Sequence, residues 1–243
     1  YPHIMGINIA LCETEAQNAP CREMKLTVVK AKVEGKKFEP YMDVDEVVSL
    51  EDAAKAVGDM EAFLKRNRIN AETDAIYMDK VKKDEDKALL AQYVKKVPTG
   101  WVDLSKMDDA TKAEALESGD KNDRVTAWDQ VEFDDMNEMC SKCALSWDKG
   151  RGCMGSFGPE TSQLPAIAQK YGCPIIGAVF ENAKEMKRLS PEDAKAVLNE
   201  VEILKPALVE EGKMAVHRYS GPLERIEAVA KVSVEQNCGF YFF

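Results

Sequence analysis

The chain has 243 residues, of which 45% are hydrophobic and 31% are charged, a balance typical of a folded globular protein rather than a disordered one. Its formal net charge of -10 disfavours binding to nucleic acids or to anionic membranes, because both attract clustered lysine and arginine. The longest apolar runs, such as residues 174–180, are much shorter than the roughly 20 residues that cross a bilayer, so no membrane span is expected.

Two strands are predicted near the N-terminus. Residues 4–11 and 24–33 are short runs rich in branched apolar side chains, and turn residues follow the second run. Within that run the apolar residues change face at the adjacent pair Val28 and Val29. Such a change indicates a bulge or a stretch buried on both faces.

Three helices are predicted to follow these strands. Ser49 can accept a hydrogen bond from a free amide of a first helical turn, and the apolar residues after it keep a helical spacing as far as Leu64. Further helical patterns cover residues 71–95 and residues 108–118. The charged residues on their other faces are expected to form solvated surface.

The polar segment 120–124 marks a predicted boundary between two regions. Residues 1–119 form an N-terminal α+β region in this interpretation. Residues 120–243 form a second region, which carries most of the cysteines and the C-terminal elements.

The C-terminal part changes its pattern quickly. Ser190 begins a helix that extends to about Glu211, with a proline in its first turn. Residues 213–219 then have the pattern of a strand, residues 222–236 that of a helix, and residues 239–243 that of another strand. The predicted fold is therefore α+β, with a mixed sheet, packed helices, a cysteine-bearing loop region and a β-α-β unit at the C-terminus.

Seven cysteines beside only two histidines are the unusual feature of the composition. The odd number and the lack of a visible export signal argue against a disulfide framework and favour reduced thiols in a cytoplasmic protein. Eleven methionines add further side chains that oxidise readily, a composition that suits a cell with little oxygen.

The cysteine spacing predicts a metal site. Cys140 and Cys143 are separated by two residues and can present both sulfurs to one centre. The glycine-rich sequence that follows allows a turn that brings Cys153 back to the same point. An iron-sulfur cubane held by cysteine alone needs a fourth thiolate, and Cys173 is the nearest candidate. The predicted ligands are thus Cys140, Cys143, Cys153 and Cys173.

Three other cysteines leave alternatives open. Cys238 replaces Cys173 as the fourth ligand if Cys173 is a core residue. Cys12 and Cys21 are most simply buried core residues, because free cysteine is among the most buried residue types. A second site formed by Cys12, Cys21 and Cys238 is the alternative to that interpretation.

The predicted function is that of an iron-sulfur protein with a [4Fe-4S] cluster. Such a protein would be an electron-transfer or accessory component of an anaerobic redox system, acting with a protein redox partner or within a larger complex. Iron-sulfur is favoured over zinc because structural zinc sites usually show two paired knuckles, and the second pair is missing here. The alternatives are a structural zinc-binding interaction protein and a thiol-disulfide oxidoreductase that uses Cys140 and Cys143.

Overall fold

A computed structural model describes residues 6–147 and 152–243, and it divides the chain into two compact units. Unit 1 contains the described residues up to Thr27 and those from Ala127 to the C-terminus, and unit 2 is Val28–Thr126. The amide of Ala127 donates to the carbonyl of Thr27 at 2.9 Å, so the chain leaves unit 1 and returns to it at one point. Unit 2 is therefore an insertion into unit 1.

The two units together have the predicted α+β fold, but their boundaries differ from the division proposed at residues 119 and 120. That point lies inside unit 2, between α5 (Asp109–Ser118) and β6 (Arg124–Thr126). All strand pairs in the described residues are antiparallel, so the expectation of a mixed sheet was wrong. No helix in the described part of the chain is both long and apolar enough to cross a membrane.

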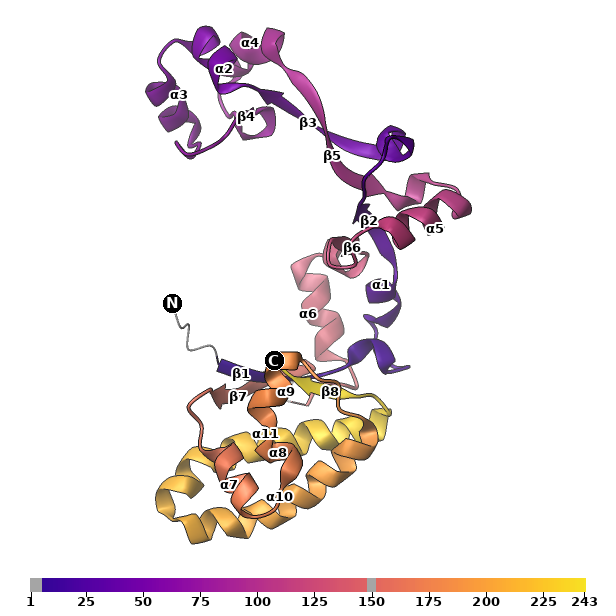
Figure 1. Ribbon diagram of the computed structural model, residues 1–243, viewed down its shortest axis with the longest axis vertical. Coiled ribbons are helices and arrows are strands. Elements are labelled where there is room, and N and C mark those ends of the chain that lie inside the picture. Colours follow the sequence, from indigo (N-terminus) through magenta and orange to yellow (C-terminus); the bar gives the residue numbers. More distant parts are fainter. Residues whose placement is uncertain (1–5, 148–151) are drawn as a thin grey trace. The chain divides into compact units, whose positions relative to one another are not determined.

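The sheet of unit 1 has three strands in the order β7-β1-β8, with β1 (Gly6–Leu11) between β7 (Met154–Pro159) and β8 (Phe240–Phe242) (Figure 1). Ile9 of β1 pairs with Gly155 on one side and with Phe242 on the other. The first and last elements of the chain are thus joined at the centre of unit 1. The strand predicted at the C-terminus is confirmed in β8.

Helices cover this sheet and supply most of its core. Unit 1 contains α1 (Arg22–Leu26), α6 (Phe133–Ser141), α7 (Leu164–Lys170), α8 (Pro174–Gly177), α9 (Val179–Glu185), α10 (Pro191–Glu211) and α11 (Lys213–Gln236). Figure 1 shows α10 and α11 packed alongside each other. Ser190 caps α10 as predicted: its hydroxyl accepts from the amide of Asp193, whose side chain accepts from the amide of Ser190.

The strand predicted at residues 213–219 was wrong, because this segment is the first part of α11. The predicted β-α-β unit at the C-terminus is therefore wrong as well, because its first strand is absent. Ala215 and Leu223 are buried in the core of unit 1, and packing along α10 outweighs the weak local preference of a short segment. Pro222 was expected to begin a helix, but it lies inside one.

The sheet of unit 2 has five strands in the order β4-β3-β5-β2-β6. The strands not yet bounded are β2 (Val28–Lys32), β3 (Met42–Val48), β4 (Ile76–Tyr77) and β5 (Lys95–Asp103). The ladder between β2 and β6 shifts register between Val28 and Lys30, which confirms the predicted irregularity at Val28 and Val29. The strand predicted over residues 24–33 begins late, since α1 occupies its first residues.

Three further helices belong to unit 2, and one long helical prediction fails there. They are α2 (Leu50–Val57), which Ser49 caps as predicted, α3 (Met60–Asn67) and α4 (Asp84–Leu90). Residues 71–95 do not form one helix, because Ile76 pairs with β3 and the side-chain oxygen of Asn67 accepts from the amides of Lys82 and Lys83. Between these tertiary bonds the chain forms the short strand β4 and one 3₁₀ turn, Met78–Lys80, before α4 begins.

Candidate functional site

Four cysteines of unit 1 line one small pocket. They are Cys21, Cys140, Cys143 and Cys153. They come from three separate segments: the start of α1, the end of α6 with the residues after it, and the residue before β7. The volume of the pocket is about 40 Å³, space for one or a few water molecules. Its other walls include the apolar side chains of Trp128, Met139 and Leu145.

The chain turns back after Cys143 as the glycine-rich sequence predicts. The amide of Trp147 donates to the carbonyl of Gly152 at 3.3 Å, and the amide of Gly152 donates to the hydroxyl of Ser146 at 3.2 Å. The carbonyl of Cys153 then accepts from the amide of Leu11 at 2.9 Å, which fixes this residue against β1. Cys143 and Cys153 therefore reach the same pocket.

One backbone amide is aimed at a pocket sulfur. The amide of Leu145 donates to Sγ of Cys143 at 3.4 Å. Amides that point at cysteine sulfurs stabilise thiolates bound to metals and adjust the potential of iron-sulfur clusters. Cys143 is thus placed in a local geometry that suits a metal-bound thiolate.

Charged side chains line the pocket beside Cys21. Cys21 precedes α1, and Lys25 lies one turn further along that helix and lines the same pocket. Nζ of Lys25 pairs with the carboxylate of Glu13 at 2.5 Å and lies 5.6 Å from the ring centre of Trp128. Burial lowers the pKa of Lys25, but the hydrogen bond to Glu13, the charge of Glu13 and the nearby thiols together outweigh burial, so the net pKa is raised. Lys25 therefore stays positively charged beside the sulfurs.

Two of the pocket thiols, those of Cys21 and Cys153, are stabilised in their protonated form. Burial, with a smaller contribution from the charge of Glu13, raises the pKa of Cys153 to about 12. Burial also raises the pKa of Cys21, although the charge of Lys25 opposes this shift. The free thiols of Cys21 and Cys153 therefore carry protons at neutral pH, and a bound metal would have to displace them.

The structure places Cys173 elsewhere. Cys173 is fully buried before α8, and its Sγ lies 3.8 Å from the carbonyl oxygen of Glu200 in α10. Burial raises the pKa of this thiol. The Glu200 side chain accepts from the amides of Ile175 and Ile176 at 3.1 Å and 2.8 Å, in the first turn of α8. Cys173 is thus a core residue beside a capped helix and does not line the cysteine pocket.

Cys12 and Cys238 lie near each other, where β1 ends and β8 begins. The amide of Cys12 donates to the carbonyl of Gly239 at 2.8 Å. Burial raises the pKa of Cys12 to about 12, with the charge of Glu15 adding to it, and raises the pKa of Cys238 to about 11. Glu15 is itself paired with Arg188 at 2.7 Å. These two cysteines do not line the pocket that contains Cys21, with which the sequence had grouped them, although Cys143 of that pocket contributes to the raised pKa of Cys238.

Sequence reasoning missed Cys21 as a neighbour of Cys140, Cys143 and Cys153. No local spacing connects residue 21 with residues 140–153, and only the insertion of unit 2 between them explains their approach. As the side chains stand, no three His, Cys, Asp or Glu groups of residues 6–147 and 152–243 are gathered as a site for a metal ion. The four thiols line one pocket, but in this conformation they are not close enough together to bind a metal ion.

No protein-family model matches the chain, and comparisons with curated proteins and with solved structures find no significant match.

Proposed function

We propose that unit 1 binds a metal centre through Cys21, Cys140, Cys143 and Cys153, and that this centre is a [4Fe-4S] cluster. The observation that supports this proposal is that four cysteines from three segments line one pocket. Four thiolates are the usual ligand set of such a cluster. Electron transfer, or an accessory role in an anaerobic redox system, follows as the function of the protein.

The surroundings of the four thiols fit this chemistry. A cluster bound by four thiolates carries negative charge, which the ammonium of Lys25 would offset. The amide of Leu145 supplies a hydrogen bond to a ligand sulfur, and apolar side chains such as Trp128 limit access of water. Binding of a cluster requires the thiol side chains to rotate and the walls to separate, since the free space is about 40 Å³.

The size of the pocket supports a second candidate, a structural zinc ion on the same four thiols. A single ion bound at about 2.3 Å from each sulfur needs much less space than four irons and four sulfides. In this alternative unit 1 is an interaction domain whose cysteines stabilise the fold.

Thiol-disulfide exchange by Cys140 and Cys143 has less support. Reactive cysteines of this type usually lie at the N-terminus of a helix, where the helix dipole favours the thiolate. Cys140 instead lies in the last turn of α6 (Phe133–Ser141), the end of the helix that disfavours a negative charge.

Metal analysis of the full chain purified without oxygen tests these proposals. We expect about four irons and four acid-labile sulfides per chain, with an electron paramagnetic resonance signal after reduction. About one zinc per chain without iron would favour the second candidate. A protein with neither metal, whose Cys140 and Cys143 cycle between thiol and disulfide, would contradict both.

A matched pair of variants tests the identity of the fourth ligand. Cys21→Ala removes a thiol from the pocket, and Cys173→Ala removes a buried thiol outside it. We expect Cys21→Ala to lose iron and sulfide or to change the resonance spectrum, and Cys173→Ala to keep both. The reverse result would identify Cys173, and not Cys21, as the fourth ligand.

A further inference from the structure

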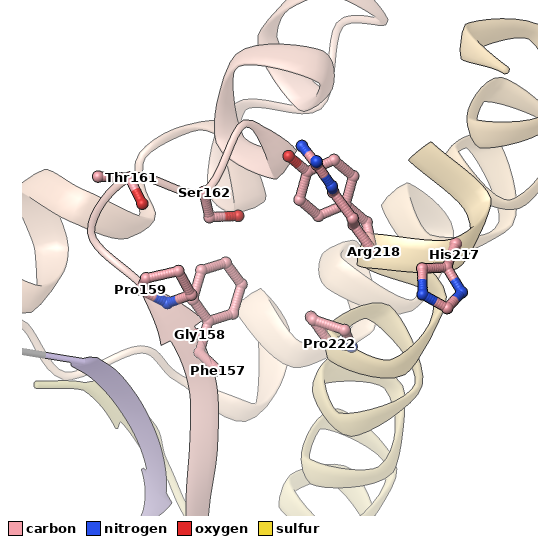
Figure 2. A pocket seen from close by; sticks show the side chains of 9 residues that line it. Phe157, Gly158, Pro159, Thr161, Ser162, His217, Arg218 and Pro222 are labelled. Atoms are coloured by element: carbon pink, nitrogen blue, oxygen red, sulfur yellow. The ribbon is translucent and has the colours of Figure 1, made fainter. Parts of the chain in front are cut away.

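A second and larger cavity lies in unit 1 between the segment after β7 and the first half of α11. Its volume is about 400 Å³, within the roughly 300–1,000 Å³ range of small-molecule sites. Figure 2 shows Phe157 and Ser162 on one side, and His217, Arg218 and Pro222 of α11 on the other. The cysteines described above do not line this cavity.

The side chains that line this cavity include a positive charge and no negative one, whereas the chain as a whole is negatively charged. Arg218 and His217 line it, and none of its lining residues is Asp or Glu, although the chain carries a net charge of -10. Arg218 forms no ion pair with any residue of the described chain. The cavity therefore offers a guanidinium that no carboxylate of the described residues neutralises.

Two hydroxyl groups of the cavity are held by backbone amides in a way that leaves their protons free. The hydroxyl of Tyr219 accepts from the amide of Gln163 at 3.2 Å, and the hydroxyl of Ser162 accepts from the amide of Leu164 at 3.3 Å. Each hydroxyl accepts in these bonds and can still donate its own proton to a ligand. The fixed amides hold both donors in place.

A proline inside α11 shapes the same wall. Pro222 has no amide hydrogen, so the carbonyl of Arg218, four residues earlier, lacks its usual helical partner. Arg218 and Tyr219 lie in the turn that precedes this proline. The ring of Pro222 adds apolar surface beside the polar groups.

We propose that this cavity binds a small organic anion through a carboxylate or phosphate group. The guanidinium of Arg218 can hold either group with two parallel hydrogen bonds, and the hydroxyls of Ser162 and Tyr219 donate to its remaining oxygens. The carbon skeleton of the ligand lies against Pro222. This inference does not depend on the metal proposal, because the two pockets share no residue.

Titration of the full chain with three related probes tests the proposal. Phenyl phosphate and benzoate carry the two anionic groups on one ring, and benzyl alcohol is the uncharged control. The chain has only two histidines, so the imidazole signals of His217 can be assigned by nuclear magnetic resonance with His217→Gln and followed during each titration. We expect saturable shifts with at least one anion and none with the alcohol. The anion that binds more tightly identifies the group that the cavity recognises.

Variants of the two arginines in α11 separate this site from general charge attraction. Arg218→Gln should weaken anion binding about tenfold or more, the usual effect of losing a charge-assisted hydrogen bond. Arg225→Gln, in the same helix but outside the cavity, should leave binding unchanged. Arg218 is exposed, so its replacement does not disturb the core, and Tyr219→Phe provides a second variant that should weaken binding. Absence of anion binding, equal binding of benzyl alcohol, or equal affinity in Arg218→Gln would overturn the proposal.

Discussion

The two units of this chain are stabilised in different ways. Unit 1 packs its helices and sheet around one continuous core, and all seven cysteines of the sequence belong to it. Unit 2, every residue of which the structure describes, has two separate clusters of six buried residues each. Both of the pockets that carry the functional proposals lie in unit 1. The proposed binding sites are thus confined to unit 1, whereas unit 2 folds around two small cores.

The ladder between β3 and β5 shows how unit 2 is built. Met42, the first residue of β3, packs on one cluster, and Val48, the last, is buried in the other. Between them residues 43–46 are exposed, as are their partners at the start of β5. Backbone hydrogen bonds therefore connect two small cores across a solvated strand pair, and each core can be disrupted by itself.

The largest expected effect comes from Phe63→Ala in the cluster of α2–α4. Phe63 is fully buried, and truncation of a buried phenylalanine costs about 3–5 kcal/mol, more than a cluster of six residues is expected to tolerate. Hydrogen exchange should show lost protection in residues 50–94 with unit 1 unchanged. Phe133→Ala in α6, where the side chain is 73% exposed, is the control and should change neither unit. Loss of protection throughout the chain would show that the two units unfold together.

A smaller effect is expected in unit 1 from Gly155→Ala in β7. A Cβ at this position would lie 2.5 Å from the ring of Trp147, so the indole has to move. Such overpacking costs about 1–3 kcal/mol. Thermal unfolding followed by the fluorescence of Trp147, after Trp101 and Trp128 are replaced by Phe, measures it. Ser156→Ala, at the exposed next residue, is the matched control. An unchanged midpoint in Gly155→Ala would mean that the indole is not held against β7.

The smallest effect is a pH dependence confined to unit 2. Hydrogen bonds from Arg66, at 2.6 Å and 2.8 Å, lower the pKa of the buried Asp86 carboxyl, although burial opposes the shift. A carboxyl with a lowered folded-state pKa stabilises the protein above its unfolded value of about 3.9, and this contribution is lost as the pH falls through the folded-state pKa. Asp86→Asn should therefore make unit 2 less stable at neutral pH, and the difference from the unmodified chain should shrink in acid.

Urea unfolding of unit 2 between neutral pH and about pH 3 provides this measurement. Asp84→Asn is the matched control, because Asp84 lies in the same helix with a side chain that is 98% exposed. A constant difference between Asp86→Asn and the unmodified chain at every pH would contradict the proposed titration.

The parts of the fold that could be predicted from the sequence are those fixed by local chemistry. Ser49 and Ser190 cap helices, and the change of face at Val28 and Val29 becomes a register shift, because each depends on residues next to one another. Residues 213–219 could not be predicted, since their helix is stabilised by α10 rather than by their own pattern. The non-helical conformation of residues 81–83, just before α4, likewise depends on Asn67.

The cysteine pocket could likewise be predicted from the sequence only in part. The spacing of Cys140, Cys143 and Cys153 and the glycines near them predict that these three thiols approach one another, and the structure brings them together. The position of the fourth thiol could not be read from spacing, because Cys21 comes from the other side of the inserted unit. Nearness in sequence suggested Cys173, which is buried beside Glu200 instead. Whether these thiols bind metal stays a prediction for the experiments above.

The central position of β1 has a consequence for the order of events during synthesis. β1 is synthesised before unit 2, whereas both of its partners, β7 and β8, are synthesised after unit 2. Unit 2 is a continuous segment and can fold as soon as Thr126 has emerged. Cys21 is synthesised before unit 2, and the other three pocket cysteines are synthesised after it. A metal centre bound by these four thiols would therefore be assembled only after the whole of the inserted unit has been made.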